Sequence, residues 1–222
     1  TILTYGNYSH GIFAYAYNGV ATVDNLDGHI ETSGDYAYGI YAYGYSGVNV
    51  SNGSNTVITS GYSAVGIFGF SAGDYVYIDS GTVVTSGNNS DGIVGISLAD
   101  YVEIHSDYVD TSGDFSTGII AYAPFGDAYV ESFSVDTTGD FSDGIVAFSG
   151  FYDAIVNSVY VTTDGLNSYG IYAFSAFDDV YVDSYSVQTL GDYSTGIYAY
   201  AYDNAYVTSD FVYTAGDYSD GI

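Results

Sequence analysis

Apolar and polar residues alternate along this chain in short runs, and the runs recur at a nearly constant interval. The dipeptide Gly-Ile marks the interval, with successive copies 25 to 28 residues apart. Between copies, apolar residues occupy every second position, whereas Gly, Asp, Ser and Asn interrupt the runs. Alternation with a period of two indicates β-strands that have one buried face, so the chain is an array of β repeats. The glycines of these dipeptides are Gly11, Gly39, Gly66, Gly92, Gly118, Gly144, Gly170, Gly196 and Gly221.

Each repeat predicts three short strands. In the repeat that begins at Gly118 they cover residues 119–122, 128–131 and 135–137. No helical pattern connects the strands, which excludes a fold built from βαβ units. A β-propeller or jelly roll would need a fourth strand or hairpin turns, and the Asn-Gly turn signal occurs only at Asn18 and Asn52. The pattern therefore favours an all-β parallel β-solenoid with three strands per coil and about 26 residues per coil.

The repeats predict one continuous stack. We expect residues 1–222 to form a single solenoid domain of eight repeats, about 38 Å long at about 4.8 Å per coil, within a longer chain. The coils start near Gly11, Gly39, Gly66, Gly92, Gly118, Gly144, Gly170 and Gly196.

Two corners of each coil have a characteristic residue type. After the third strand we expect glycines with positive φ. These are Gly34, Gly61, Gly87, Gly113, Gly139, Gly165, Gly191 and Gly216. After the second strand, small polar side chains are expected to hydrogen-bond along the stack. These are Asn25, Asn52, Ser80, Ser106, Ser132, Ser158, Ser184 and Ser209.

The charge of the chain excludes several functions. It has 27 acidic residues and neither Lys nor Arg, which gives a formal net charge of -27. Without cations we expect no binding to nucleic acid, no attraction to anionic membrane surfaces and no phosphoryl chemistry. No Cys is present, so disulfides and thiolate metal sites are excluded. The sequence shows neither a membrane-spanning apolar stretch nor a signal-peptide pattern, as expected for a mature or internal piece.

Two segments resemble a known family. Residues 34–43 and 191–200 are similar to the G-[DN]-x-S-x-G-I-x-A repeats of bacterial autotransporter (type V secretion) passenger domains. The likeness extends over the whole chain, although passenger domains usually carry some Lys and fewer Tyr. The resemblance implies a right-handed parallel β-helix, secreted to the cell surface. Extracellular location is therefore an expectation of the resemblance.

The first strand of each coil is apolar on both faces. If its Ile and Ala residues face inward, the residues between them form two outward columns. An apolar stripe of this size predicts a contact face for another rod. Reversed sides, a turn folded over this face and stacking of sugars on the rings are the alternatives. The expected lateral contact face consists of Tyr41, Tyr43, Phe68, Phe70, Tyr122, Phe148, Tyr172, Phe174, Tyr198 and Tyr200.

Acidic residues also recur at equivalent positions. Oxygen ligands suit Ca²⁺, although no EF-hand or calcium-binding nonapeptide pattern is present, and a solvated acidic face is the competing interpretation. The calcium candidates are Asp114, Asp140, Asp192 and Asp217. No other cofactor is expected. His10, His29 and His105 lack the spacing of metal ligands, and His105 is expected to form an ion pair between Asp79 and Glu131.

No catalytic site stands out as a break in the repeat, so we expect no enzyme activity. The Thr residues of the third strand share the phase of buried Val residues, so they point inward and cannot form an ice-binding row. We therefore expect an extracellular structural repeat protein that forms a rod or fibre by self-association through the lateral contact face. The alternative is an adhesin passenger that binds host or neighbouring-cell glycans or proteins.

Overall fold

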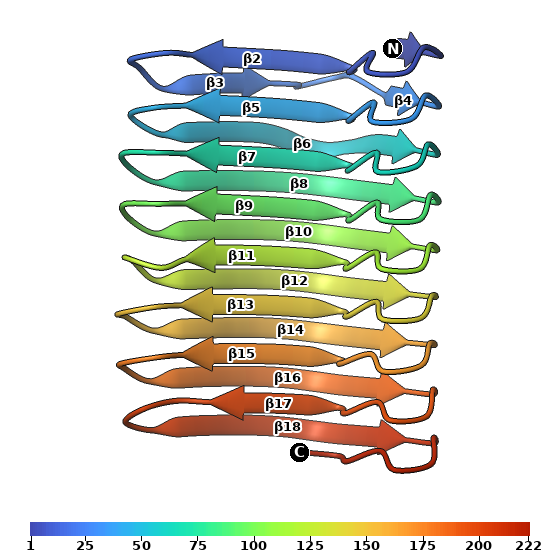
Figure 1. Ribbon diagram of the computed structural model, residues 1–222, viewed down its shortest axis with the longest axis vertical. Coiled ribbons are helices and arrows are strands. Elements are labelled where there is room, and N and C mark those ends of the chain that lie inside the picture. Colours follow the sequence, from blue (N-terminus) through green and yellow to red (C-terminus); the bar gives the residue numbers. More distant parts are fainter.

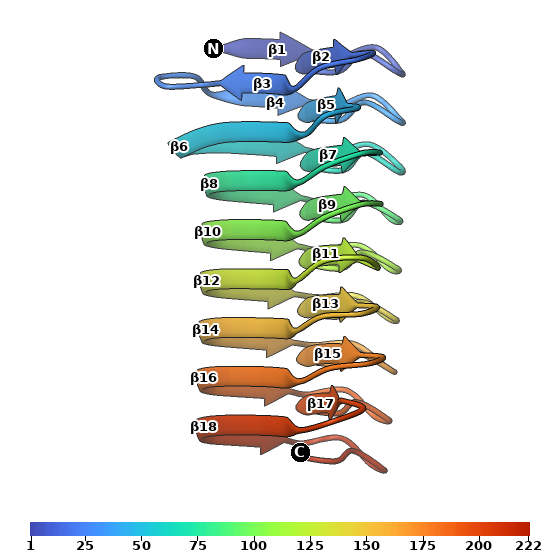
Figure 2. The same cartoon turned by 90° about the vertical axis from the view of Figure 1, so that its left-hand side faces the viewer.

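A computed structural model of residues 1–222 shows a parallel β-solenoid of about eight coils without any helix (Figure 1). Each coil lies directly under the preceding one, and the first and last coils lie at opposite ends of the stack (Figures 1 and 2). Equivalent residues of successive coils pair in register, for example Ile119 with Ile145 and Ala121 with Ala147. The predicted fold is therefore confirmed, including the period of about 26 residues.

The strands form two parallel sheets. The smaller, eight-stranded sheet contains β2 (Ile12–Ala16), β5 (Ile40–Gly44), β7 (Ile67–Ser71), β9 (Ile93–Ser97), β11 (Ile119–Ala123), β13 (Ile145–Ser149), β15 (Ile171–Ser175) and β17 (Ile197–Tyr200). The larger, ten-stranded sheet contains β1 (Ile2–Thr4), β3 (Ala21–Asp24), β4 (Ile30–Thr32), β6 (Val48–Thr59), β8 (Val76–Thr85), β10 (Val102–Thr111), β12 (Ala128–Thr137), β14 (Ala154–Thr163), β16 (Val180–Thr189) and β18 (Ala205–Thr214).

The second and third predicted strands of a coil are joined in the structure. Only the first coil keeps them apart, as β3 and β4; from β6 onward they form one long strand. In β12 the buried side chains are Ala128, Val130 and Ser132, followed after two outward residues by Val135 and Thr137. The alternation of buried and outward residues therefore shifts by one position after Ser132. This shift marks a bend, visible in Figure 2 where the long strands fold back on themselves. Residues pair on both sides of the bend, as at Ser106 with Ser132 and at Tyr108 with Ser134, so one strand passes through it.

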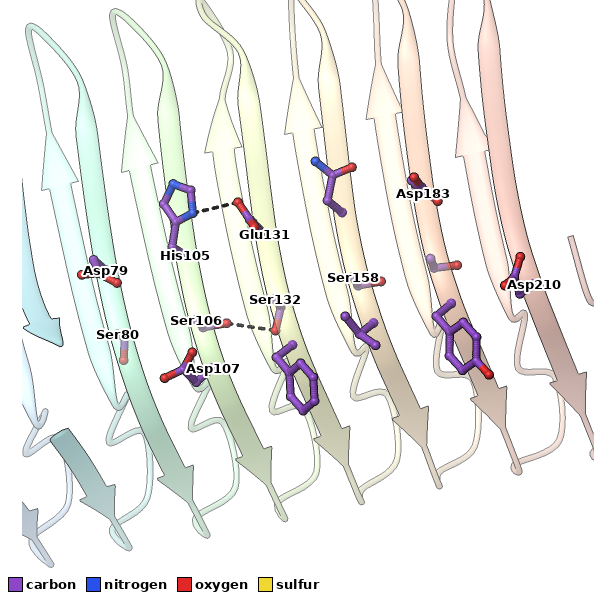
Figure 3. A pocket seen from close by; sticks show the side chains of 15 residues that line it. Asp79, Ser80, His105, Ser106, Asp107, Glu131, Ser132, Ser158, Asp183 and Asp210 are labelled. Atoms are coloured by element: carbon purple, nitrogen blue, oxygen red, sulfur yellow. Dashed lines mark hydrogen bonds and ion pairs between the residues drawn. The ribbon is translucent and has the colours of Figure 1, made fainter. Parts of the chain in front are cut away.

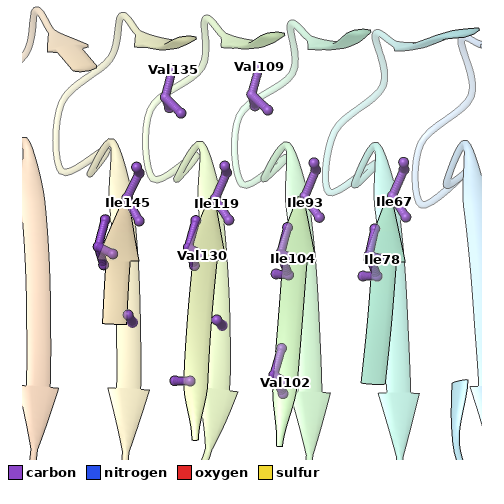
Figure 4. Close-up of a cluster of buried hydrophobic side chains, with 14 of the residues drawn as sticks. Ile67, Ile78, Ile93, Val102, Ile104, Val109, Ile119, Val130, Val135 and Ile145 are labelled. Carbon is purple, nitrogen blue, oxygen red and sulfur yellow. The ribbon is translucent and has the colours of Figure 1, made fainter. Parts of the chain in front are cut away.

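The core is a set of stacked columns (Figure 4). A cluster of 33 buried Ile, Val and Ala residues extends along the solenoid, and most of these side chains are completely buried. The core is narrow, because a Cβ at Gly95 would lie 2.8 Å from Val102 Cγ1. This width explains why the first strand alternates Ile with Ala or Gly: a larger second residue would collide with the sheet opposite.

The prediction of positive φ at the corner glycines is wrong. None of the eight has a positive φ; the left-handed conformation occurs two residues later, at Phe115 (φ 56°) and Phe141 (φ 57°), and at the equivalent residues of other coils. Glycine is needed for a different reason. A Cβ at Gly139 would collide with the carbonyl oxygen of Gly113 in the preceding coil. The backbones of successive coils approach too closely at this corner for any side chain.

Buried hydroxyls close the same corner. The serine ladder, as we call it, consists of Ser90, Ser116, Ser142, Ser168 and Ser194. Ser142 Oγ accepts the N–H of Ser116 (3.0 Å) and donates to the carbonyl of Gly113 (2.9 Å). Thr137 Oγ1 in turn donates to the carbonyl of Ser142 (3.2 Å), and Thr137 is 1% exposed. The Thr column therefore points inward, as predicted.

At the second corner, which contains the predicted Asn and Ser column, some of the side chains are hydrogen-bonded from coil to coil. Asn25 Nδ2 donates to Asn52 Oδ1 (2.6 Å), Ser106 Oγ to Ser132 Oγ (3.0 Å), and Ser184 Oγ to Ser209 Oγ (3.0 Å). The buried hydroxyls of Ser80 and Ser158 have no partner. The predicted side-chain stack at this corner is confirmed for these three pairs.

Candidate functional site

The expected contact face is the outer surface of the eight-stranded sheet. Its residues alternate with buried Ile and Ala, so the predicted direction of the side chains is correct and the sides are not reversed. Three of the ten aromatic residues are exposed, Tyr122 at 38%, Tyr198 at 39% and Tyr200 at 49%, and the other seven are partly buried. No turn folds over the whole face. The structure therefore places all ten predicted residues on one accessible sheet surface.

The rings of this face stack from coil to coil. Tyr122, Phe148, Phe174 and Tyr200 form one ladder, with ring centroids 4.8, 5.2 and 5.0 Å apart and interplanar angles of 14° or less. A second ladder joins Tyr15, Tyr43 and Phe70 (4.7 and 5.4 Å). Parallel stacking along the axis turns the ring faces toward neighbouring coils. The surface therefore presents ring edges and phenol hydroxyls, so a sugar meets few open ring faces on which to stack.

Aliphatic side chains separate the aromatic ladders. Val94, Ile96 and Ile120 occupy the equivalent positions in the middle coils, and Val94 is only 6% exposed. Corner residues that the sequence analysis overlooked extend the face at its border: Tyr38 packs against Phe68 (5.8 Å) and Tyr169 against Tyr172 (5.4 Å). Their shared position immediately before the Gly-Ile dipeptide would have identified them.

The contact face is free of charge. No Asp or Glu lies in any of the eight strands of this sheet, although the chain has 27 acidic residues. Burial raises the pKa of Tyr41 and of Tyr172, with neighbouring phenols as a further cause. Their hydroxyls therefore stay neutral over a wider pH range. The acids lie in the corners and on the other sheet.

Two acids border this face in partly buried positions. Burial raises the pKa of Asp91 to about 6, and the hydrogen bond that Asp91 accepts from the N–H of Thr117 (2.8 Å) opposes the shift. Burial also raises the pKa of Asp143, which accepts the N–H of Tyr169. In the first coil, His10 Nδ1 accepts a hydrogen bond from the N–H of Tyr38 in the next coil (3.0 Å), and burial lowers the pKa of His10.

Three of the four calcium candidates, Asp114, Asp140 and Asp192, accept hydrogen bonds from the next coil. Asp114 Oδ1 accepts the N–H of Asp140 (3.1 Å), and Asp192 Oδ1 accepts the N–H of Asp217 (2.8 Å). Asp140 Oδ1 in turn accepts the N–H of Leu166 (2.9 Å). The structure does not bring these four carboxylates together as a group of three or more. Their placement explains the recurrence of Asp after the corner glycine without an ion.

A different set of carboxylates does converge. Asp153, Asp178 and Asp179 have oxygens within 4.8 Å of one another, an arrangement that would suit a hard cation such as Ca²⁺. The calcium candidates predicted from the sequence lie in another column, although Asp127, Asp153 and Asp179 also recur at intervals of 26 residues. Acidic groups gather in this way on many protein surfaces without an ion.

A shallow groove of ≈ 510 Å³ runs along the bend of the long strands (Figure 3). Asp79, His105, Glu131 and Asp183 line one side. His105 Nδ1 lies 3.1 Å from Glu131, as predicted, and its other nitrogen lies 2.7 Å from Glu103. Asp79 is the register partner of His105 on β8 but forms no ion pair with it. The histidine therefore links two carboxylates, one on its own strand and one on the next coil.

No helix that could cross a membrane is present. Comparison of the chain with protein-family models, with curated proteins and with solved structures finds no match. The functional conclusion therefore depends on the geometry and chemistry of these faces.

Proposed function

We propose that this protein is an extracellular structural rod that associates side by side with further copies of itself through the lateral contact face. The observation that carries the proposal is a charge-free aromatic sheet surface on a chain with 27 acids and no Lys or Arg. The resemblance to secreted passenger repeats supports the extracellular location.

Electrostatics favours this face over every other. Two copies cannot attract each other through Lys or Arg, because the chain has neither. Carboxylates about 4 Å apart repel by about 1 kcal/mol per pair even at the dielectric constant of water, so acidic faces oppose contact between copies. The eight-stranded sheet is the surface on which two copies meet without this repulsion.

The available area is sufficient for a weak specific interface. Five residues per strand and eight strands give a surface of about 16 Å by about 38 Å, or about 600 Å² per copy. Two such surfaces bury about 1,200 Å², the lower limit for stable protein interfaces. The ring edges provide apolar contact, and the phenol hydroxyls provide hydrogen bonds.

Sedimentation and electron microscopy of designed variants test the proposal. Phe148→Asp places a charge in the centre of the aromatic ladder, and we expect it to weaken association at least about tenfold. Phe148→Tyr keeps the ring and should retain association. Phe133→Asp, at a similarly apolar but 57% exposed position on the other sheet, is the matched control and should associate like the parent protein.

Circular dichroism establishes that each variant keeps its β structure. Association that is weakened as much by Phe133→Asp as by Phe148→Asp would contradict the assigned face. A parent protein that remains monomeric at about 100 µM, a concentration that populates even weak complexes, would contradict self-association altogether and favour a tethered adhesin.

A further inference from the structure

The composition of the chain concentrates oxidative chemistry on tyrosine. The sequence has 29 Tyr but no Cys, Met or Trp, the side chains that usually react first with oxidants. It also has no Lys, so neither a disulfide nor a lysine-derived bond can cross-link the coils. A one-electron oxidant therefore finds phenols as its principal targets.

The fold brings tyrosines together in pairs on adjacent coils. The rings of Tyr181 and Tyr206 have centroids 5.0 Å apart and an interplanar angle of 10°. Both rings are accessible, with 38% and 52% of their surface exposed. Their backbones are fixed, because Tyr181 and Tyr206 are register partners in β16 and β18. Equivalent geometry occurs at Tyr15–Tyr43 and Tyr172–Tyr198.

The Tyr181–Tyr206 pair has an additional feature. Tyr181 Oη donates a hydrogen bond to Asp179 Oδ2 (2.9 Å). This hydrogen bond holds the phenol oxygen of Tyr181 beside the carboxylate. A phenol that loses an electron also loses its proton, and Asp179 is placed to accept it. Tyr181 is therefore the tyrosine of this pair that we expect to react first.

We propose that Tyr181 and Tyr206 form an oxidative modification site, at which a peroxidase-type enzyme and hydrogen peroxide join the two rings as dityrosine. Each phenol loses one electron and one proton, which leaves a radical with spin density on the ring carbons beside the hydroxyl. A carbon–carbon bond forms between one such carbon of each ring, and the hydrogens on these carbons move to the phenol oxygens. Hydrogen peroxide takes up the two electrons and two protons and becomes two water molecules.

The coupling needs only side-chain motion. The reacting carbons must approach from stacking distance, and the exposed rings can tilt about their side-chain torsions while the paired strands stay in place. The product is a covalent link between the last two long strands. This inference does not depend on the lateral association of rods, because both tyrosines belong to one chain and lie outside the lateral contact face.

Peptide mapping after oxidation tests the proposal. The folded protein is treated with a peroxidase and hydrogen peroxide, unfolded and cleaved before Asp, since the chain lacks trypsin sites. We expect peptides 179–182 and 203–209 to be joined, lighter than their sum by two hydrogen atoms, with dityrosine fluorescence. The yield should be independent of protein concentration and confined to chains of monomer size.

Two Phe variants and a small-molecule control complete the design. Tyr206→Phe keeps the stacked ring and should abolish this cross-linked peptide, whereas Tyr202→Phe, an exposed tyrosine beside Phe177, should leave its yield unchanged. N-acetyltyrosine amide in the same reaction shows that the oxidant is active. Coupling of the small molecule without the 179–182 to 203–209 link would overturn the proposal. So would a yield that does not exceed that of couplings through Tyr202.

Discussion

Asp and Asn side chains at one corner of this solenoid accept hydrogen bonds from the coil that follows them. Asp114 accepts a backbone N–H of the next coil, and Asn88 does the same one coil earlier with its amide oxygen (3.2 Å to Asp114 N). The hydrogen bond therefore requires an acceptor at that position but no charge. Carboxylates at such positions stabilise the stack by their bonds and oppose it by their mutual repulsion and desolvation.

Asp91→Asn tests this balance. Burial raises the pKa of Asp91 from 3.8 to about 6 in the folded protein. Because the folded-state pKa of Asp91 lies above its unfolded-state value, protonation of Asp91 favours folding. Its contribution to the free energy of unfolding is complete below about pH 4 and is lost as the pH rises toward about 6. Asn keeps an acceptor and never ionises. We expect the variant to be more stable than the parent by about 1–2 kcal/mol at neutral pH and equal to it in acid.

Urea unfolding at acidic and neutral pH measures the difference. Asp107→Asn, at an exposed acid in the groove, is the control and should change stability little at either pH. If Asp91→Asn raised the free energy of unfolding by the same amount at both pH values, ionisation of Asp91 would not be the cause of the stabilisation.

At the scale of elements, the solenoid is held by ladders that run across the strands. The core columns supply apolar burial, and the serine ladder supplies hydrogen bonds at the corner between each long strand and the first strand of the next coil. Each ladder hydroxyl accepts a hydrogen bond from one backbone N–H of the preceding coil and donates one to a backbone carbonyl of that coil, as Ser142 does. A buried backbone group that loses its partner costs about 1–3 kcal/mol.

Ser142→Ala should therefore destabilise the protein by about 2–4 kcal/mol, because it leaves the N–H of Ser116 and the carbonyl of Gly113 without this partner. Denaturant unfolding followed by circular dichroism measures the loss. Ser134→Ala, eight residues earlier in an outward position of β12, should change the free energy of unfolding by less than about 0.5 kcal/mol. Equal effects of the two substitutions would contradict the role of the ladder.

The whole molecule is a rod with one uncharged face and acidic surroundings. Its formal net charge of -27 makes copies repel one another, over a distance that shortens as the salt concentration rises. Raising NaCl from about 20 mM to about 500 mM shortens the screening length from about 20 Å to about 4 Å. Lateral association through an apolar face is then opposed less by the surrounding acids.

We expect the dissociation constant for association to fall at least about tenfold over this salt range. Sedimentation velocity at several concentrations measures it. Association that weakens with salt would indicate contacts between opposite charges and contradict the proposed face. Association that appears only with Ca²⁺ and disappears with a chelator would instead assign the contact to the carboxylates, for example the group around Asp179.

The sequence by itself determined the repeat, the parallel stacking and the direction of most side chains. Those properties follow from local alternation: the same phase that buries Ile119 and Ala121 exposes Tyr122, and Thr137 shares the phase of Val135. The outward direction of the aromatic face follows from the same alternation, whereas its role as a contact face is a proposal. Its freedom from acids is also a property of the linear pattern, once the first strand of each coil is identified.

The relation between neighbouring coils was decided only by the tertiary structure. Positive φ occurs at Phe141 rather than at Gly139. Residue 139 is glycine because the backbone of the preceding coil excludes a Cβ there. Asp114 and Asp140 bind backbone N–H groups, and the rings of Phe148 and Phe174 show their edges, because the adjacent coil occupies the space beside each of them. The sequence pattern records which side of a strand a residue occupies, whereas these contacts depend on distances between residues 26 positions apart.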